Sequence, residues 1–232
     1  MIILHQFPPA AGLPNISPFS LKLETWLRIA GLEYQTVSTP NPRSAPLGKL
    51  PYIELEGRKI ADSALCIAAL SEKFAIDLDR HLSAEQRAVA DAFGHLLEDH
   101  FYYALVYSRW IDPEYWPEAK RIFFGALPPP LNRLVPVLAR SQIRRDLHGQ
   151  GLSRHRPEQI YDFAEQDLAS VSAWLADKPY FMGDTVSSID ATVFGFLAQA
   201  TLVRMASPLP AIAANYPNLK AYCERLRTRY FG

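Results

Sequence analysis

The chain has 232 residues, of which 49% are hydrophobic and 21% charged, so it can bury a substantial core as one large domain or two ordinary ones. Its 24 Lys and Arg residues balance its 24 Asp and Glu residues, so the net charge gives no reason to expect binding to nucleic acid or to an anionic membrane. Cys66 and Cys223 are the only cysteines and neither belongs to a C-x-x-C pair, so a disulfide framework, a cysteine-based zinc site and a dithiol redox motif are unsupported.

The beginning of the chain carries no sign of a targeting segment. Met1 is followed at once by the strand-like residues "IILHQF", with no basic region before them. No apolar run approaches the roughly 20 residues that a membrane span requires. We therefore expect a cytoplasmic protein with no membrane span.

The first third of the chain alternates strand and helix patterns. The predicted elements are a strand at 2–7, a helix at 18–31, a strand at 33–38, a loop with one helical turn at 41–49, a hairpin at 51–60 and a helix at 62–74. Gly31 is expected to be the C-cap of the first helix, and the hairpin is expected to turn at Glu56 and Gly57. A right-handed crossover makes the first two strands parallel, and the hairpin adds an antiparallel pair. Residues 1–76 therefore form a predicted βαβαββα domain.

Every pattern after about Ser83 is helical. The predicted helices cover 84–110, 112–125 and 131–150, followed by helices that start after Pro157, after Ser187 and at Pro217. A kink is expected at Pro136. Ser187 and Asp190 form a capping box, which stabilises the start of a helix and has no catalytic meaning. Residues 84–232 are therefore predicted to be an all-helical second domain.

Three motifs follow one another in the first domain: "NISPFS" at a strand-to-helix turn, "GKLPYIELEG" at a loop-to-strand entry and "IADSALCIAAL" at a helix start. In that order they resemble the thioredoxin-like half of the glutathione transferases, and the helical remainder is similar to that family's second domain. The phrases "SPFSLKLETWLRIAGLEY" and "DKPYFMGDTVSSIDATVFGFLAQ" resemble more specifically the metaxin and failed-axon-connections branch. The resemblance covers nearly the whole chain. It implies the glutathione transferase fold, an α/β thioredoxin-like N-terminal domain followed by an all-α C-terminal domain.

Ser17 is the candidate catalytic residue. With Pro18 at the first helical position, Ser17 falls at the N-cap, where its oxygen accepts from a backbone N–H and its hydroxyl hydrogen stays free to donate. The resemblance implies that this hydroxyl stabilises the glutathione thiolate, with help from the positive end of the helix. Helix capping alone is the alternative. Relatives that exchange disulfides carry cysteine here, so "SPFS" excludes that chemistry at this site, and Asn15 offers a further polar contact.

The second motif implies a site for the peptide part of glutathione. In the family its proline is cis, so Leu50 and Pro51 would hold the cysteinyl backbone of the tripeptide. Lys49 would face the glycyl carboxylate, with Arg43 as a second candidate. For both cations the alternative is a solvated surface charge.

The third motif implies a site for the γ-glutamyl end of glutathione. The carboxylate of Asp62 would face the ammonium group, and Ser63 with a helix-start N–H would face the carboxylate. The family more often has Glu or Gln at the first position, so Asp62 reaches one methylene less far. Plain helix capping is the alternative.

An aromatic segment, "HFYYALVYSRWIDPEYW", could form the wall for an apolar electrophile. Tyr103 and Tyr107 are the candidates for this pocket, although aromatic residues at helical spacing more often belong to a core. Arg109 is interpreted as a structural partner of a nearby carboxylate.

No metal site is expected. His95, Asp99 and His100 are close in sequence, but two histidines five residues apart do not share one helical face and no third ligand is evident.

Two kinds of function remain open. The first is a glutathione transferase that uses glutathione as co-substrate and conjugates it to a small apolar electrophile, as the resemblance implies. The second is a non-catalytic, metaxin-like interaction or scaffold protein. A variant of the first keeps glutathione but catalyses a peroxidase, dehalogenase or isomerase reaction. The resemblance also implies a homodimer.

Overall fold

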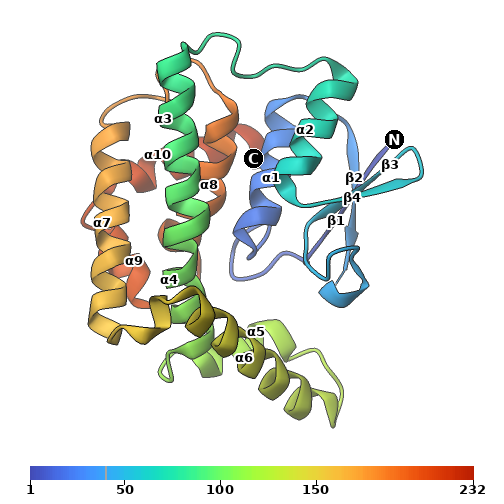
Figure 1. Cartoon of the computed structure of the whole chain (residues 1–232), viewed down its shortest axis with the longest axis vertical. Coiled ribbons are helices and arrows are strands. Elements are labelled where there is room, and N and C mark those ends of the chain that lie inside the picture. The colour runs from blue at the N-terminus through green and yellow to red at the C-terminus, as the bar shows by residue number, and fades with distance from the viewer. Residues whose placement is uncertain (40) are drawn as a thin grey trace.

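The computed structural model describes residues 1–39 and 41–232. A small sheet with two helices forms one half of the molecule, and helices alone form the other half (Figure 1). This arrangement confirms the predicted fold class. The division into domains at residues 76 and 84 stays a prediction.

The sheet has the predicted mixed topology. Its strands are β1 (Ile2–Gln6), β2 (Tyr34–Ser38), β3 (Tyr52–Leu55) and β4 (Arg58–Ala61). They lie in the order β2-β1-β3-β4, with β1 parallel to β2 and the other pairs antiparallel. The hairpin turns at Glu56 and Gly57, whose φ angles of 52° and 78° are those of a tight hairpin turn.

The helices of this half are α1 (Pro18–Ile29), the 3-10 turn η1 (Pro42–Ser44) and α2 (Ser63–Phe74). Helix α1 buries Leu23, Trp26 and Leu27 against the sheet. Its C-cap is Ala30, one residue before the predicted Gly31, and Gly31 follows with a φ of 67°. Glycine suits that place because it adopts a positive φ without a steric penalty.

The second half is entirely helical. Its elements are α3 (Ala84–His95), η2 (Leu96–Phe101), α4 (Tyr102–Val106), η3 (Tyr107–Ile111), α5 (Trp116–Phe124), α6 (Leu131–Gln150), η4 (Leu152–Arg154), α7 (Pro157–Leu175), α8 (Ser188–Thr201), α9 (Pro208–Ala213) and α10 (Pro217–Phe231). The predicted helix at 84–110 is one helical run, but η2 and η3 within it are π-helical. Sequence patterns missed η4 and α9, because so few residues show no clear period.

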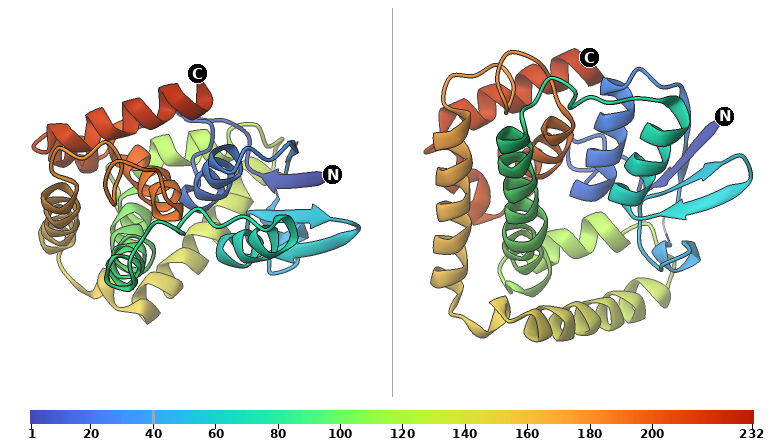
Figure 2. Two further views of the ribbon diagram at one scale, coloured as in Figure 1. Left: turned by 90° about the horizontal axis from the view of Figure 1, so that it is seen from above. Right: turned by 45° about the horizontal axis from the view of Figure 1, so that its top comes forward.

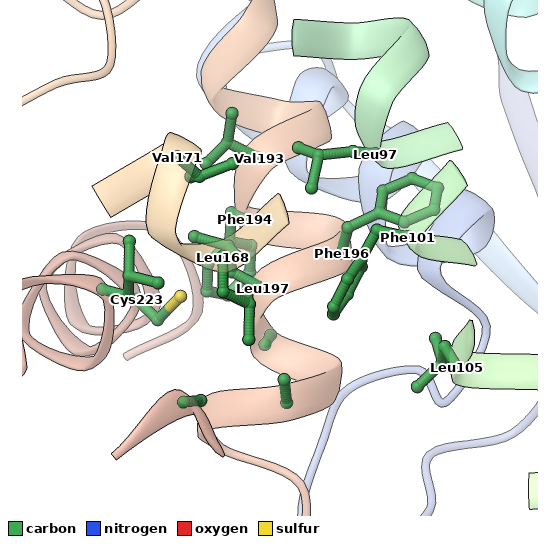
Figure 3. Close-up of a cluster of buried hydrophobic side chains, with 14 of the residues drawn as sticks. Leu97, Phe101, Leu105, Leu168, Val171, Val193, Phe194, Phe196, Leu197 and Cys223 are labelled. Atoms are coloured by element: carbon green, nitrogen blue, oxygen red, sulfur yellow. The ribbon is translucent and has the colours of Figure 1, made fainter. Parts of the chain in front are cut away.

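The core of this half surrounds α8. Side chains from η2, α4, α7 and α10 converge on Val193, Phe194, Phe196 and Leu197 of α8 (Figure 3). Helix α8 is buried nearly all round, as expected for a helix at the centre of a domain. The predicted capping box is present at its start, where Asp190 accepts from the backbone N–H of Ser187 at 2.8 Å.

Helix α1 lies between the sheet and α8 (Figure 2). The two helices approach most closely at Gly195, where an added Cβ would lie 2.8 Å from the carbonyl oxygen of Pro18 and 2.9 Å from the backbone nitrogen of Lys22. Lys22 also forms an ion pair of 2.5 Å with Glu98 of η2. Helix α1 is thus held by the sheet on one side and by α8 and η2 of the helical half on the other.

Helices α5 and α6 extend away from the rest of the bundle (Figure 1). One face of α6 exposes Leu131, Leu134, Val137 and Leu138. Within residues 1–39 and 41–232, no helix combines the length and apolar character needed to cross a lipid bilayer.

Candidate active site

The sheet register brings the three predicted motifs to one edge of the sheet. The end of β1 pairs with Tyr52 at the start of β3, and Tyr52 pairs with the last residue of β4. Ser17 follows β1, Pro51 precedes β3 and Asp62 follows β4. Residues that are distant in sequence therefore meet at this edge, which is the candidate active site.

Ser17 is the N-cap of α1, as predicted. Its Oγ accepts from the backbone N–H of Ser20 at 3.4 Å, longer than a typical N–H···O bond, and the side chain is half-buried. The hydroxyl hydrogen remains available to donate. Pro18 has no N–H and the N–H of Ser20 is bonded to Ser17, so the groups that can stabilise an anion here are this hydroxyl, the backbone N–H of Phe19 and the positive end of α1.

Asn15 holds the loop before Ser17 and is fully buried. Its Oδ1 accepts from the backbone N–H of Ser17 at 2.9 Å, and its Nδ2 donates to the carbonyl of Phe7 at 2.7 Å. Both polar groups of the amide are therefore used within the protein. Asn15 positions Ser17 through these bonds.

Arg109 supports the same loop from the helical half. Its Nη1 donates to the carbonyl of Ile16 at 2.8 Å, and its Nη2 donates to Oε1 of Gln199 at 2.8 Å. Gln199 in turn donates to the carbonyl of Asn15 at 3.2 Å. The predicted carboxylate partner of Arg109 is wrong, because both partners are neutral. No local motif predicts this network, since Arg109 and Gln199 lie far from Ile16 along the chain.

The Leu50–Pro51 peptide bond is cis, as the family resemblance implies. Leu50 and Pro51 are buried, and none of the hydrogen bonds among the residues that the structure describes uses the N–H or the carbonyl of Leu50. Lys49 and Arg43 are both exposed. The N–H and the carbonyl of Leu50 are thus free beside the cis peptide bond, and the cations Lys49 and Arg43 stand in the segment before it.

Asp62 and Ser63 begin α2. One carboxylate oxygen of Asp62 accepts from the N–H groups of Ala64 at 2.8 Å and Leu65 at 3.3 Å, so Asp62 does cap the helix. Its φ of 75° is unfavourable for a residue other than glycine, and strain of this kind is typical of functional sites. Its second carboxylate oxygen faces no hydrogen-bond donor within the described ranges, and Ser63 is buried beside it.

Phe19 is the aromatic residue nearest to Ser17 along the chain, and the pocket role of Tyr103 and Tyr107 stays a prediction. Phe19, two residues after Ser17, packs edge-on against Tyr102 with ring centroids 5.0 Å apart, and Tyr102 contacts Tyr103 at 5.3 Å. Tyr107 is buried and packs against Tyr161 of α7. Burial raises the pKa of Tyr102 to about 12, so it is a neutral phenol at pH 7. Tyr102, which the sequence did not single out, is the tyrosine that joins the "SPFS" motif to the helical half.

The two histidines considered for a metal site pair with two different carboxylates. His95 pairs with Asp99 at 3.0 Å, and His100 pairs with Asp167 at 2.7 Å. Burial raises the pKa of Asp167. In the described part of the chain no three His, Cys, Asp or Glu side chains are grouped as metal ligands.

These features define a thioredoxin-like domain joined to a helical domain. Family models agree with this class: the glutathione S-transferase N-terminal domain matches residues 18–115, and the glutathione S-transferase C-terminal domain matches residues 164–226. Among solved structures, a glutathione S-transferase of Ceriporiopsis subvermispora in complex with glutathione has a TM-score of 0.66 at 20% identity, covering 98% of this chain and 96% of that one.

Sequence relatives extend the comparison over the whole chain. Isoprene-epoxide–glutathione S-transferase of Rhodococcus sp. (strain AD45) is 36% identical and covers 99% of both chains. Failed axon connections of Drosophila melanogaster is 35% identical over 100% of this chain, which spans 58% of that protein. Metaxin-1 of Mus musculus is 31% identical over 95% of this chain and 72% of its own length. The chain belongs to the glutathione S-transferase family and is similar to its metaxin-like branch.

Proposed function

We propose that this protein binds glutathione and transfers it to a small apolar electrophile. The observation that carries the proposal is the similarity, along 99% of both chains, to a relative named isoprene-epoxide–glutathione S-transferase. That name supports an epoxide of a small alkene as the class of electrophile. Phe19 and Tyr102, which pack together beside Ser17, are suited to an apolar molecule.

Glutathione would lie along the edge of the sheet that carries the three motifs. The free N–H and carbonyl of Leu50 would pair with its cysteinyl backbone, and Lys49, or else Arg43, would face its glycyl carboxylate. Ser63, with the second carboxylate oxygen of Asp62, would bind the γ-glutamyl end. Each contact uses a group that is free or accessible, so binding does not require the protein to break its own hydrogen bonds.

Ser17 is the proposed catalytic residue. Its hydroxyl donates to the glutathione sulfur and stabilises the thiolate together with the start of α1. The thiolate attacks an epoxide carbon, the carbon–oxygen bond breaks, and the resulting alkoxide takes up a proton equivalent to the one that the thiol released. The rate gain comes from positioning and from the lowered thiol pKa, with no covalent bond to the enzyme.

The experiment compares Ser17→Ala with Ser20→Ala, because Ser20 lies in the same helical turn and its buried Oγ has no partner in the described structure. For Ser17→Ala we expect turnover of a small epoxide to fall about 10–100-fold and the thiol pKa of bound glutathione to rise by about 1–2 units, since one anion-stabilising donor is lost. Ser20→Ala should leave both unchanged. A wild-type protein that binds no glutathione at millimolar concentration would refute the proposal.

A second candidate is a glutathione-binding interaction protein, favoured by the similarity to Failed axon connections and metaxin-1. Glutathione binding with no turnover, and no change in Ser17→Ala, would support it. Turnover with a peroxide, a haloalkane or an isomerisable substrate in place of an epoxide would instead identify the other glutathione-dependent reactions.

We also infer a cytoplasmic homodimer. Leu65 and Phe74 of α2 are 60% and 40% exposed and offer an apolar surface to a second copy, while the two buried free cysteines suit a reducing compartment. Light scattering should therefore give twice the chain mass, and Leu65→Ser should weaken the dimer. The proposed reaction requires no metal ion, so turnover should survive a chelator.

A further inference from the structure

Arg109 is a buried cation without a counter-ion. Its side chain lies in η3 and the residue is 4% exposed. Across residues 1–39 and 41–232, no carboxylate oxygen lies within 4.0 Å of its guanidinium nitrogens. Its Nε has no hydrogen-bond partner there either, although it is buried.

Such an arrangement is unfavourable for folding. Burial disfavours the charged guanidinium and lowers the pKa of Arg109 to about 10, so the group still carries its charge at pH 7. A neutral amide could donate to the carbonyl of Ile16 equally well and would avoid most of this cost. Holding the loop therefore does not by itself explain why a cation occupies this position.

The position of the charge suggests an explanation. The carbonyl that accepts from Nη1 belongs to Ile16, and the same peptide group supplies the backbone nitrogen of Ser17. The guanidinium of Arg109 therefore contacts the peptide group that joins Ile16 to Ser17, the candidate catalytic residue. Because Arg109 is buried, water screens its charge less than it screens the charge of a surface arginine.

No ionisable group in the described part of the chain forms an ion pair with Arg109, and Tyr102 is the one whose charge acts on it. Tyr102 is neutral at pH 7, as an ordinary tyrosine is, and burial raises its pKa further, to about 12. Lys22 and Glu98 neutralise one another in their ion pair of 2.5 Å. Two carboxylates remain charged: Asp62, one oxygen of which accepts from two backbone N–H groups at the start of α2, and Asp146 of α6, whose charge contributes to raising the pKa of Tyr102.

We propose that Arg109 is a positioning residue for glutathione transfer, which fixes the loop before Ser17 through the carbonyl of Ile16 and stabilises the glutathione thiolate with its buried positive charge. The inference rests on the proposed function and adds the charge of Arg109 to the groups that stabilise the ionised thiol of glutathione. Unit charges roughly 8 Å apart, at an effective dielectric constant of about 20, shift a pKa by about one to one and a half units.

The primary test uses the full-length variants Arg109→Gln and Arg109→Lys. The readout is the thiol pKa of bound glutathione, followed by the ultraviolet absorbance of the thiolate against pH, together with the glutathione Kd and the thermal midpoint. Arg109→Gln keeps a donor for Ile16 but removes the charge, so the thiol pKa should rise by about one unit with less than a threefold change in Kd. Arg109→Lys should restore most of the shift.

A second pair of variants keeps Arg109 itself and remains informative if Arg109→Gln does not fold. Gln199→Glu places a carboxylate beside Nη2 of Arg109, whereas Gln199→Leu removes the acceptor for Nη2 and adds no charge. Both variants lose the donation from Gln199 to the carbonyl of Asn15. The thiol pKa should rise by about one unit more in Gln199→Glu than in Gln199→Leu, because only the former neutralises the guanidinium.

The outcomes separate this inference from the proposed function. If the wild type binds glutathione with a lowered thiol pKa, and that pKa is the same in Arg109→Gln or in both Gln199 variants, the electrostatic role is wrong and the transferase proposal stands. If the wild type shows no bound thiolate, the proposed function is wrong and the role of Arg109 falls with it. A loss of thermal stability with an unchanged pKa identifies a purely structural arginine.

Discussion

Gly195 in α8 gives the most direct test of how α1 is held. In Gly195→Ala the new Cβ would lie 2.8 Å from the carbonyl oxygen of Pro18, and 2.9 Å and 3.1 Å from the backbone nitrogen and Cα of Lys22. All three are backbone atoms of α1, so no side chain can rotate away. Helices α1 and α8 must therefore separate by several tenths of an ångström.

The size of the effect follows from two opposing terms. Overpacking in a close-packed core costs about 1–3 kcal/mol, and rigid backbone contacts below 3.0 Å place this site in the upper half of that range. Replacing glycine by alanine within a helix returns about 1 kcal/mol. The net loss of unfolding free energy is about 1–2 kcal/mol, which in a chain of this size lowers the thermal midpoint by roughly 2–8 °C.

The assay is thermal unfolding of Gly195→Ala beside Gly94→Ala. An added Cβ at Gly94 meets only the side chain of Ile189 at 3.6 Å, an ordinary contact, so this control should unfold at the wild-type temperature or above it. Because Pro18 directly follows Ser17, the displaced α1 should also weaken glutathione binding in Gly195→Ala. A Gly195→Ala protein as stable as Gly94→Ala, with unchanged affinity, would refute this account of the interface.

Three further predictions concern single side chains. Cys66 and Cys223 are buried, and burial raises the pKa of each thiol to about 12, so the thiolate fraction at pH 8 is about 10⁻⁴. Neither cysteine should therefore react with a disulfide reagent until the protein is unfolded. Fast reaction of either cysteine in the native protein would contradict this prediction. The carboxylate of Asp190 accepts hydrogen bonds from the N–H groups of Phe181 and Ser187 and from the hydroxyl of Tyr222. Asp190→Asn would place an amide NH₂, itself a donor, against these donors, and should lower the unfolding free energy measured in urea by about 2–4 kcal/mol. An unchanged urea midpoint would contradict this prediction. Ser17→Cys places a thiol at a helix start, where its pKa falls. After oxidised glutathione is added, intact-mass measurement should show one mixed disulfide in this variant and none in the wild type. An unmodified variant would show that glutathione does not reach this position.

Most of the fold was predictable because its signals are local. The alternating burial of β1, the glycine in the β3–β4 turn and the proline at the start of α1 each act within a few residues. The order of the strands then follows from the handedness of the crossover and the short hairpin. The elements that were missed, η4 and α9, are short and are held by their neighbours.

The contact between Tyr102 and Phe19 does not follow from a regular helical period, and the pocket role of Tyr103 and Tyr107 stays a prediction. The predicted helix at 84–110 has 3.6 residues per turn, but η2 precedes Tyr102 and η3 begins at Tyr107. A π-helical turn inserts one additional residue, which rotates the following side chains by about 100° relative to a regular helix. Tyr102 therefore packs against Phe19, while Tyr107 turns toward Tyr161.

The candidate site was predictable only in its N-terminal part. The capping serine, the proline before β3 and the acidic residue before α2 stand in short motifs, whereas Arg109 and Gln199 act on residues separated from them by 93 and 184 positions. Asn15, Ile16 and Ser17 belong to no strand or helix, so their geometry depends on these distant donors. In the proposed complex the sheet and its motifs supply the groups that contact glutathione, but the helical half determines where Ser17 stands. For that reason we expect substitutions in η3 and α8, away from every motif in the sequence, to change the thiol chemistry as strongly as substitutions among the proposed glutathione-binding residues.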